Sequence, residues 1–308
     1  MIPLRLFLFI VSLGFGTVAG AQVTNRSVDT QDAFLCTGSP NYENGADLTG
    51  LNFGAAGTLA VAPASSAKGS FESVLMFNLS AGVAQFNAAY GTNHWNITGV
   101  ALDLASNYGV AGVQPNNPIF NVIAGGQFAI EWLSDSNWVE GTGTPNLPTT
   151  DGVCYESLPT LLTPPCEILC TNSYLPPGDN VRVPWPLSLS TNLLGNIMNG
   201  GNVSFLFFAV DNQLSYLFNS YSYGRGNQPY LNVVANPLLV LLGGVFTNGV
   251  FQLTGIGGDN GVYNVETSTN LASPHWVTIG AVTADTNGVI LYDDPRAVVP
   301  PRYYRLSQ

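Results

Sequence analysis

Short runs of alternating apolar and polar side chains dominate this chain, and turn-forming residues separate them. In Val74–Leu79, for example, Leu75 and Phe77 fall on one face and Asn78 on the other. Such two-residue periodicity predicts β-strands. The strands expected in the first part of the chain are Ala33–Cys36, Thr58–Val61, Val74–Leu79, Ile97–Leu104, Phe120–Ile123, Gln127–Leu133, Val203–Val210, Tyr216–Tyr223 and Tyr230–Val234.

Helical periodicity is rare by comparison. Only Leu193–Met198 predicts a short helix, opened by Ser190 or Thr191 as the capping residue. Many short strands with turn signals between them are typical of sandwiches and jelly rolls. The pattern therefore predicts an all-β protein whose first domain is a jelly-roll type β-sandwich.

A second β unit is expected after Ala235–Pro237, where one unit closes and another begins. This divides the chain into a domain at 22–236 and a small module at 237–308. Asn248–Gly249 and Asn287–Gly288 predict tight hairpin turns. The module is expected to be a small fibronectin/immunoglobulin-like β-sandwich. Its predicted strands are Val250–Thr254, Val262–Ser268, Trp276–Ile279, Val289–Tyr292 and Tyr303–Leu306.

The N-terminal segment, residues 1–21, predicts an export signal. Arg5 supplies a positive end, an apolar run covers Leu6–Val18, and Ala19–Ala21 is a small-residue cleavage site. The run is shorter than the roughly 20 residues that span a bilayer. We therefore expect a secreted or cell-surface protein without a membrane span after removal of the signal. A second apolar stretch, Leu238–Phe246, predicts a buried strand.

Composition narrows the range of partners. The net charge is −11, and only 9% of the residues are charged, against roughly 25% in ordinary globular domains. Binding of nucleic acid depends on clustered Lys and Arg, whereas this chain has a single lysine, Lys68, and scattered arginines. Nucleic acid is therefore excluded as an expected partner.

The four cysteines are Cys36, Cys154, Cys166 and Cys170. In an exported chain, an even number without CxxC spacing favours disulfides over a zinc site. We expect a bridge within Cys154, Cys166 and Cys170, and the partner of Cys36 stays open. These three cysteines lie in Asn137–Asp179, an irregular segment with seven prolines. Its length predicts a functional loop or a disulfide-stapled insertion.

Several short motifs occur in a fixed order between residues 28 and 235. They are Asp32-Ala33-Phe34, Gly45-Ala46-Asp47-Leu48, Val74–Ser80, Val100–Leu104, Trp138-Val139-Glu140-Gly141, Ser220 and Pro229–Val233. In this order the first domain resembles the DNRLRE-type module, also classed as carbohydrate-binding module family 96. The resemblance implies a jelly-roll sandwich on secreted and surface proteins, some of which bind acidic polysaccharide. The chain departs from the family strand at Met76 and Asn78, where the family has a basic and an acidic residue.

The last part of the chain resembles a small C-terminal module of secreted bacterial proteins. The residues that carry this second resemblance are Tyr263, Glu266, Ser268, Leu271, Trp276 and Arg302–Leu306. It implies a β module and no particular activity.

Glycan binding depends on an exposed aromatic ring with polar groups around it. Trp185 stands between two prolines and is expected to be exposed rather than inside a sheet. Tyr221 and Tyr223 are predicted to share one face of a strand, next to Arg225. These four residues are the candidate ligand-binding residues, and partly buried packing is the alternative for each of them.

Asp29, Asp32 and Asp47 near the start of the first domain are candidate ligands for a structural calcium ion. Carboxylate oxygens suit this hard cation, and ordinary turn formation by Asp is the alternative. No other cofactor is expected.

Catalysis has weaker support in the sequence. A glycosidase needs two carboxyl groups a few ångströms apart. Of the candidates, Glu131 is expected on the solvated face of a strand, Asp135 before a turn and Glu140 at a structural corner. His94 and His275 lack a nucleophile motif nearby. We therefore predict no enzyme.

Two functions of different classes remain. The first is a non-catalytic glycan-binding or adhesion protein, with extracellular polysaccharide or cell-surface components as partners. The alternative is a structural cell-surface or extracellular-matrix protein without a small ligand. A glycan-active enzyme is a third hypothesis.

Overall fold

The computed structural model describes residues 22–39, 46–66, 68–107, 124–175, 178–223, 226–295 and 302–308. Strands form most of this part of the chain, and the predicted all-β class with β-sandwich architecture is confirmed. The export signal predicted at 1–21 and the strand predicted at Phe120–Ile123 lie outside the described residues.

The chain divides into two compact units. The larger unit combines Thr24–Val83 with Thr98–Val234, and the smaller unit contains Ala84–Ile97 together with Ala235–Gln308. The following paragraphs describe each unit by itself.

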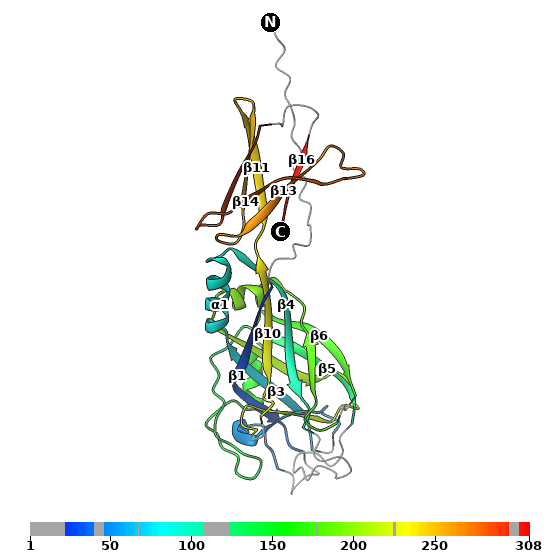
Figure 1. Cartoon of the computed structure of the whole chain (residues 1–308). Helices are drawn as coiled ribbons and strands as arrows, with labels where there is room; N and C mark the ends of the chain where they lie inside the picture. Colours follow the sequence, from blue (N-terminus) through cyan, green and yellow to red (C-terminus); the bar gives the residue numbers. More distant parts are fainter. Residues whose placement is uncertain are drawn as a thin grey trace. The chain divides into compact units, whose positions relative to one another are not determined.

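An eight-stranded sheet with the order β6-β5-β8-β3-β1-β10-β4-β7 forms the framework of the larger unit. Figure 1 labels strands β1, β3, β4, β5, β6 and β10 of this sheet. Two further strands, β2 (Thr58–Val61) and β9 (Tyr216–Asn219), pair with each other. The strands of the large sheet are β1 (Val23–Cys36), β3 (Phe71–Asn78), β4 (Trp95–Ala105), β5 (Gly126–Leu133), β6 (Cys166–Tyr174), β7 (Arg182–Pro186), β8 (Asn202–Ala209) and β10 (Tyr230–Pro237).

A cluster of buried aromatic rings fills the space between strands β5, β6, β7 and β9. Phe128 lies 5.1 Å from Trp185, and Tyr174 lies 4.3 Å from Tyr216, measured between ring centroids. Phe218 contacts the same rings. Because aromatic side chains bury large apolar areas, this cluster is a main stabilising element of the sandwich.

Trp185 belongs to this core, and the prediction that it is exposed is wrong. Only 8% of its surface is accessible, and it pairs with Leu102 across β4 and β7. Strand β7 is the edge strand of the sheet. Proline is tolerated there because its missing N–H breaks no ladder hydrogen bond, so Pro184 and Pro186 leave Trp185 free to point inward.

The helices are α1 (Ser80–Tyr90), α2 (Leu158–Leu161) and α3 (Thr191–Met198). The predicted α3 is confirmed, and the Ser190 hydroxyl caps it by accepting a hydrogen bond of 3.2 Å from the Leu193 N–H. Helix α1 was not predicted, since it lacks a distinct apolar stripe. Its four alanines favour helix. Within the described ranges, no helix is long and apolar enough to cross a membrane.

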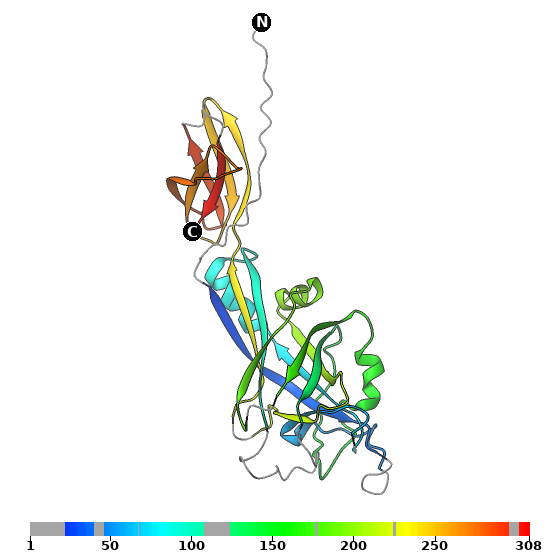
Figure 2. The same ribbon diagram turned by 90° about the vertical axis from the view of Figure 1, so that its right-hand side faces the viewer.

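The smaller unit contains two three-stranded sheets (Figures 1 and 2). Phe251, Leu253 and Val265 are buried between them. Asn248 and Gly249 both have a positive φ, as a tight hairpin turn requires. One sheet has the order β11 (Val240–Thr247), β12 (Val250–Ile256) and β15 (Val289–Asp294), and the other β14 (Val277–Thr283), β13 (Val262–Ser268) and β16 (Tyr303–Ser307).

Strand β11 corresponds to the apolar stretch for which burial was predicted. The strand is present, but Leu242, Val245 and Phe246 are exposed, so the predicted burial is wrong. Strand β11 lies at the edge of a three-stranded sheet. An edge strand has a neighbour on one side only, so an apolar sequence there does not ensure burial.

Candidate functional site

The four cysteines are unpaired, so the predicted disulfide is wrong. Cys166 and Cys170 stand four residues apart on β6. At about 3.3 Å per residue this separates their Cα atoms by roughly 13 Å, whereas a disulfide needs less than about 7 Å. Cys36 is buried on β1, and the Cys154 thiol lies 3.5 Å from the Ser157 hydroxyl.

A buried asparagine holds part of the irregular segment in place of the predicted bridge. The side-chain amide of Asn52 donates to the carbonyl oxygens of Glu140 (2.5 Å) and Val153 (2.8 Å). Its Oδ1 accepts hydrogen bonds from the N–H groups of Gly54 (3.1 Å) and Gly143 (3.0 Å). One side chain therefore satisfies four backbone groups from two distant parts of the chain.

The same loop is closed by Asp151. Its carboxylate accepts hydrogen bonds from the Thr142 N–H (3.0 Å), the Thr142 hydroxyl (2.7 Å) and the Thr149 hydroxyl (2.5 Å). These donors, led by the Thr149 hydroxyl, lower the pKa of Asp151 to about 2. Hydrogen bonds thus supply the order for which disulfides were expected, and they position Glu140 at the start of the loop.

Asp29 and Asp32 form a buried carboxyl pair on β1. Residues three apart on a regular strand point to opposite faces. However, β1 bulges against β3 between Asp29 and Gln31, where one residue is extra. A bulge of this kind re-aims the side chains beyond it, which accounts for the two carboxyls lying together.

The environment of the pair favours its protonated form. Burial is the main cause that raises the pKa of both carboxyls, and it holds the pKa of Asp29 well above neutral. After burial, the neighbouring Asp32 carboxyl is the next cause that raises the pKa of Asp29. Asp29 therefore stays uncharged at neutral pH.

The three predicted calcium ligands are not brought together. Asp47 is exposed and its Oδ1 accepts hydrogen bonds from the N–H (3.0 Å) and the hydroxyl (2.7 Å) of Thr49. In the described part of the chain, no three His, Cys, Asp or Glu side chains converge to hold a metal ion. Asp47 thus adopts the turn-forming alternative, and Asp29 and Asp32 are core residues.

Tyr221 lies in a turn that contacts the carboxyl pair through Asp32. Its backbone N–H donates a hydrogen bond of 2.5 Å to Oδ2 of Asp32, while 54% of the residue's surface is exposed. The prediction that Tyr221 and Tyr223 share a strand is wrong, because β9 ends at Asn219 and the Tyr223 N–H closes a turn on the Ser220 carbonyl at 3.1 Å. Arg225 lies outside the described residues.

Glu140 completes this group of residues. Its backbone N–H donates to Oε1 of Gln31 at 2.9 Å, and its side chain reaches the hydroxyl of Ser222 in the Tyr221 turn. Burial, followed by the Asp32 carboxyl, raises the pKa of Glu140 to about 7. We call these residues the Tyr221 site. It consists of Tyr221, Ser222 and Glu140, together with the buried Asp32 that accepts a hydrogen bond from the Tyr221 N–H.

The sequence makes Glu140 a candidate catalytic carboxylate and a member of a short motif, but it does not predict a place beside Tyr221. The Trp138-Val139-Glu140-Gly141 motif was the available signal, but it does not indicate which residues lie opposite Glu140. The turn that contains Tyr221 and Ser222 follows Glu140 by some 80 residues in the sequence. The pairing of β9 with β2 brings this turn close to Glu140.

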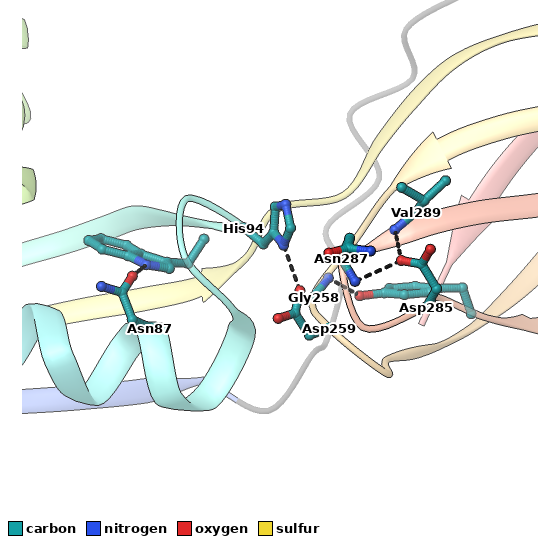
Figure 3. Close-up of polar contacts among 9 residues, drawn as sticks. Asn87, His94, Gly258, Asp259, Asp285, Asn287 and Val289 are labelled. Carbon is teal, nitrogen blue, oxygen red and sulfur yellow. Dashed lines mark hydrogen bonds and ion pairs between the residues drawn. The ribbon is translucent and has the colours of Figure 1, made fainter.

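The smaller unit holds a separate polar cluster around His94 (Figure 3). Its Nδ1 lies 2.6 Å from Oδ1 of Asp259, and both side chains are mostly buried. Nearby, Oδ1 of Asp285 accepts hydrogen bonds from the N–H groups of Asn287 (2.8 Å) and Val289 (2.9 Å). Among the described residues, no hydroxyl group is hydrogen-bonded to the His94 imidazole. The His94–Asp259 pair therefore lacks the nucleophile of a catalytic triad.

No family model and no curated protein sequence matches the chain. Among solved structures, it is similar to a β-glucuronidase from Ruminococcus gnavus, with 8% identity and a TM-score of 0.22 over 92% of this chain and 43% of that one. A β-D-glucuronidase from Dictyoglomus thermophilum gives 10% identity and a TM-score of 0.24 over 92% of this chain and 39% of that one. The chain spans less than half the length of either enzyme, and these TM-scores do not assign a shared function.

Proposed function

We propose that this protein is a non-catalytic glycan-binding or adhesion protein of the cell exterior, and that the Tyr221 site is its contact with the glycan. The observation that carries the proposal is an exposed tyrosine ring whose backbone is hydrogen-bonded to a buried carboxyl. Because this hydrogen bond holds the backbone of the turn, little backbone freedom is lost when a sugar stacks on the ring. The module resemblance described above for the first domain agrees with this proposal.

The chemistry beside the ring suits a sugar. With a pKa of about 7, the Glu140 carboxyl is present in both protonation states near neutral pH. It can therefore donate as well as accept a hydrogen bond. The Ser222 hydroxyl adds a second polar group at the same turn. An apolar ring face edged by such groups matches the two kinds of surface on a pyranose.

The same geometry favours binding over hydrolysis. A glycosidase needs two carboxyl groups that both reach the substrate. Asp29 and Asp32, whose carboxyls interact electrostatically with Glu140, are 1% and 0% exposed, so neither can contact a sugar without a rearrangement of β1. One accessible carboxyl supports recognition but does not supply an acid and a nucleophile.

The test is retention on a panel of insoluble polysaccharides, together with a glycan array, for the wild-type chain and two variants. Tyr221→Ala is expected to weaken retention about tenfold or more, equivalent to roughly 1.4 kcal/mol. Phe246→Ala removes another exposed aromatic ring, in the smaller unit, and is the matched control that should bind normally. Circular dichroism of each variant checks folding.

Two outcomes would overturn the proposal. If Tyr221→Ala and Phe246→Ala bind like wild type, the glycan site lies elsewhere. If the wild type binds no polysaccharide and assembles into ordered polymers in solution, the structural cell-surface alternative is favoured. Release of reducing sugar by the purified chain, abolished by Glu140→Gln, would favour the enzyme hypothesis instead.

A further inference from the structure

The smaller unit contains a cavity of about 350 Å³ between the end of β13, the start of β14 and the residue that precedes β16. Thr269, Ser273, His275 and Arg302 are among the residues that line it, together with the apolar residues Val277 and Ile279. Its volume is at the lower end of the range for small-molecule sites, roughly 300–1,000 Å³. A single sugar-sized molecule would fill it.

The charge of the lining is unusual for this chain. Among the described residues, the ionisable side chains that line the cavity are those of His275 and Arg302, and none is a carboxylate. The whole chain, in contrast, has 19 acidic and 8 basic residues. A cavity with basic lining in an acidic protein favours an anionic ligand.

Arg302 is held in a fixed position. Its Nη1 donates a hydrogen bond of 3.0 Å to Oδ2 of Asp294, which is fully buried and also accepts from the Tyr304 hydroxyl at 2.9 Å. Arginine carries five N–H donors in a rigid fork that matches a carboxylate. Asp294 therefore orients the fork from behind, and it is not part of the cavity lining.

Hydrogen bonds within the chain fix one wall of the cavity. The Ser268 hydroxyl donates to the Asn270 carbonyl at 3.0 Å, and Asn270 Oδ1 accepts from the Ala272 N–H at 2.9 Å. The hydroxyl oxygen of the neighbouring Thr267 is fully buried, so it does not face the cavity.

We propose that this cavity binds a small carboxylate with several hydroxyl groups, of the size of one sugar acid. Arg302 and His275 hold the carboxylate, and the hydroxyls of Thr269 and Ser273 bind the hydroxyl groups of the ligand. The cavity and the Tyr221 site lie in different units, so this proposal does not depend on the proposed glycan site.

The test is calorimetric titration of the full chain with D-galacturonate, with D-galactose as the neutral analogue and with acetate as the anion without hydroxyls. D-Galacturonate is expected to bind, and either analogue to bind at least about tenfold more weakly. Equal binding of D-galactose would show that the cation is not used. Equal binding of acetate would show that the hydroxyl groups are not used. Either result overturns the proposal, as does the absence of D-galacturonate binding.

Variants locate the binding. Arg302→Gln should weaken D-galacturonate binding at least about tenfold, whereas Arg305→Gln should not. Arg305 is a matched arginine outside the cavity lining, where its Nε pairs with Oε2 of Glu266 at 2.6 Å. Arg302→Gln also removes the cation beside buried Asp294. Ser273→Trp is therefore the second variant, because it fills the cavity from an exposed position and leaves the ion pair intact.

Binding by Ser273→Trp with wild-type affinity would place the ligand elsewhere and overturn the proposal. Tyr221→Ala should retain D-galacturonate binding in full. Loss of this binding in Tyr221→Ala, with Ser273→Trp unchanged, would assign the anion to the Tyr221 site instead.

Discussion

Asn52 Oδ1 accepts a hydrogen bond of 3.0 Å from the Gly143 N–H, and Gly143 packs so closely that a Cβ there would lie 1.9 Å from the Asn52 carbonyl oxygen. The two residues are 91 positions apart. Their contact joins the loop that carries Glu140 to the core of the larger unit, so variants of either residue test the order of the candidate site.

Asn52→Ala should destabilise the protein by about 3 kcal/mol, because it leaves several buried backbone groups without partners. Urea unfolding followed by tryptophan fluorescence measures the change. Asn264→Ala removes an exposed amide on β13, and should change stability by less than about 0.5 kcal/mol. Equal effects of the two variants would contradict the role given to Asn52.

Gly143→Ala should also be destabilising, because the added Cβ meets backbone atoms that cannot move aside. Gly195→Ala is the matched control. A Cβ at Gly195 meets nothing within 4 Å, and the residue lies inside α3. Replacing a helical glycine by alanine stabilises by roughly 0.5–1 kcal/mol. The two melting temperatures should therefore shift in opposite directions.

Stability should fall as the pH rises from about 4 to about 8. The pKa values of Asp29, Asp32, Glu72 and Glu140 are all raised in the folded protein, mainly by burial. A carboxyl with a raised pKa stabilises the fold below its unfolded value, near 4, and this stabilisation is lost as the pH rises through the folded value. Melting temperatures measured across this range should decline. A maximum near pH 8 would contradict the assignment.

Glu72 gives the cleanest single-residue version of this test. Burial raises its pKa from 4.5 to about 7. Glu72→Gln removes the titration and should stabilise the protein at pH 8 by up to about 3 kcal/mol, since one pKa unit corresponds to about 1.4 kcal/mol. At pH 4 the same variant should match wild type. Glu167→Gln is the control, for which we expect little change at either pH.

Free thiols provide a chemical test of the cysteine assignment. Denatured, unreduced protein should react with four equivalents of a thiol reagent, because all four cysteines are unpaired. In the native protein Cys36 should react last, since burial raises its pKa to about 12 and the thiolate is the reactive form. Two reactive thiols after denaturation would show that one disulfide has formed.

Glycan binding should weaken above pH 7 if Glu140 donates a hydrogen bond to the sugar. The carboxyl has a pKa of about 7, and its ionised form is an acceptor only. Glu140→Gln keeps a donor at every pH, so its affinity should be independent of pH between 5 and 9. A wild-type affinity that is equally independent of pH would exclude this role for Glu140.

The sequence by itself determined the features that depend on neighbouring residues. The short run Thr58–Val61, which follows a glycine, and the alternation in Val262–Ser268 predict β2 and β13 with their observed limits. The Ser190 cap starts α3, and Asn248–Gly249 forms the turn between β11 and β12. Each of these depends on backbone geometry and hydrogen bonds within a few residues, so a local pattern is sufficient to predict it.

Only the tertiary structure decided which face each strand buries and which polar groups meet. Trp185 turns inward because β7 is an edge strand, and the apolar β11 stays exposed because a second neighbour is missing. The bulge in β1 brings Asp29 and Asp32 together, and strand pairing brings the Tyr221 turn to Asp32 across 189 residues. Alternation along a strand fixes two faces, but burial and contact are set by segments far away in the sequence.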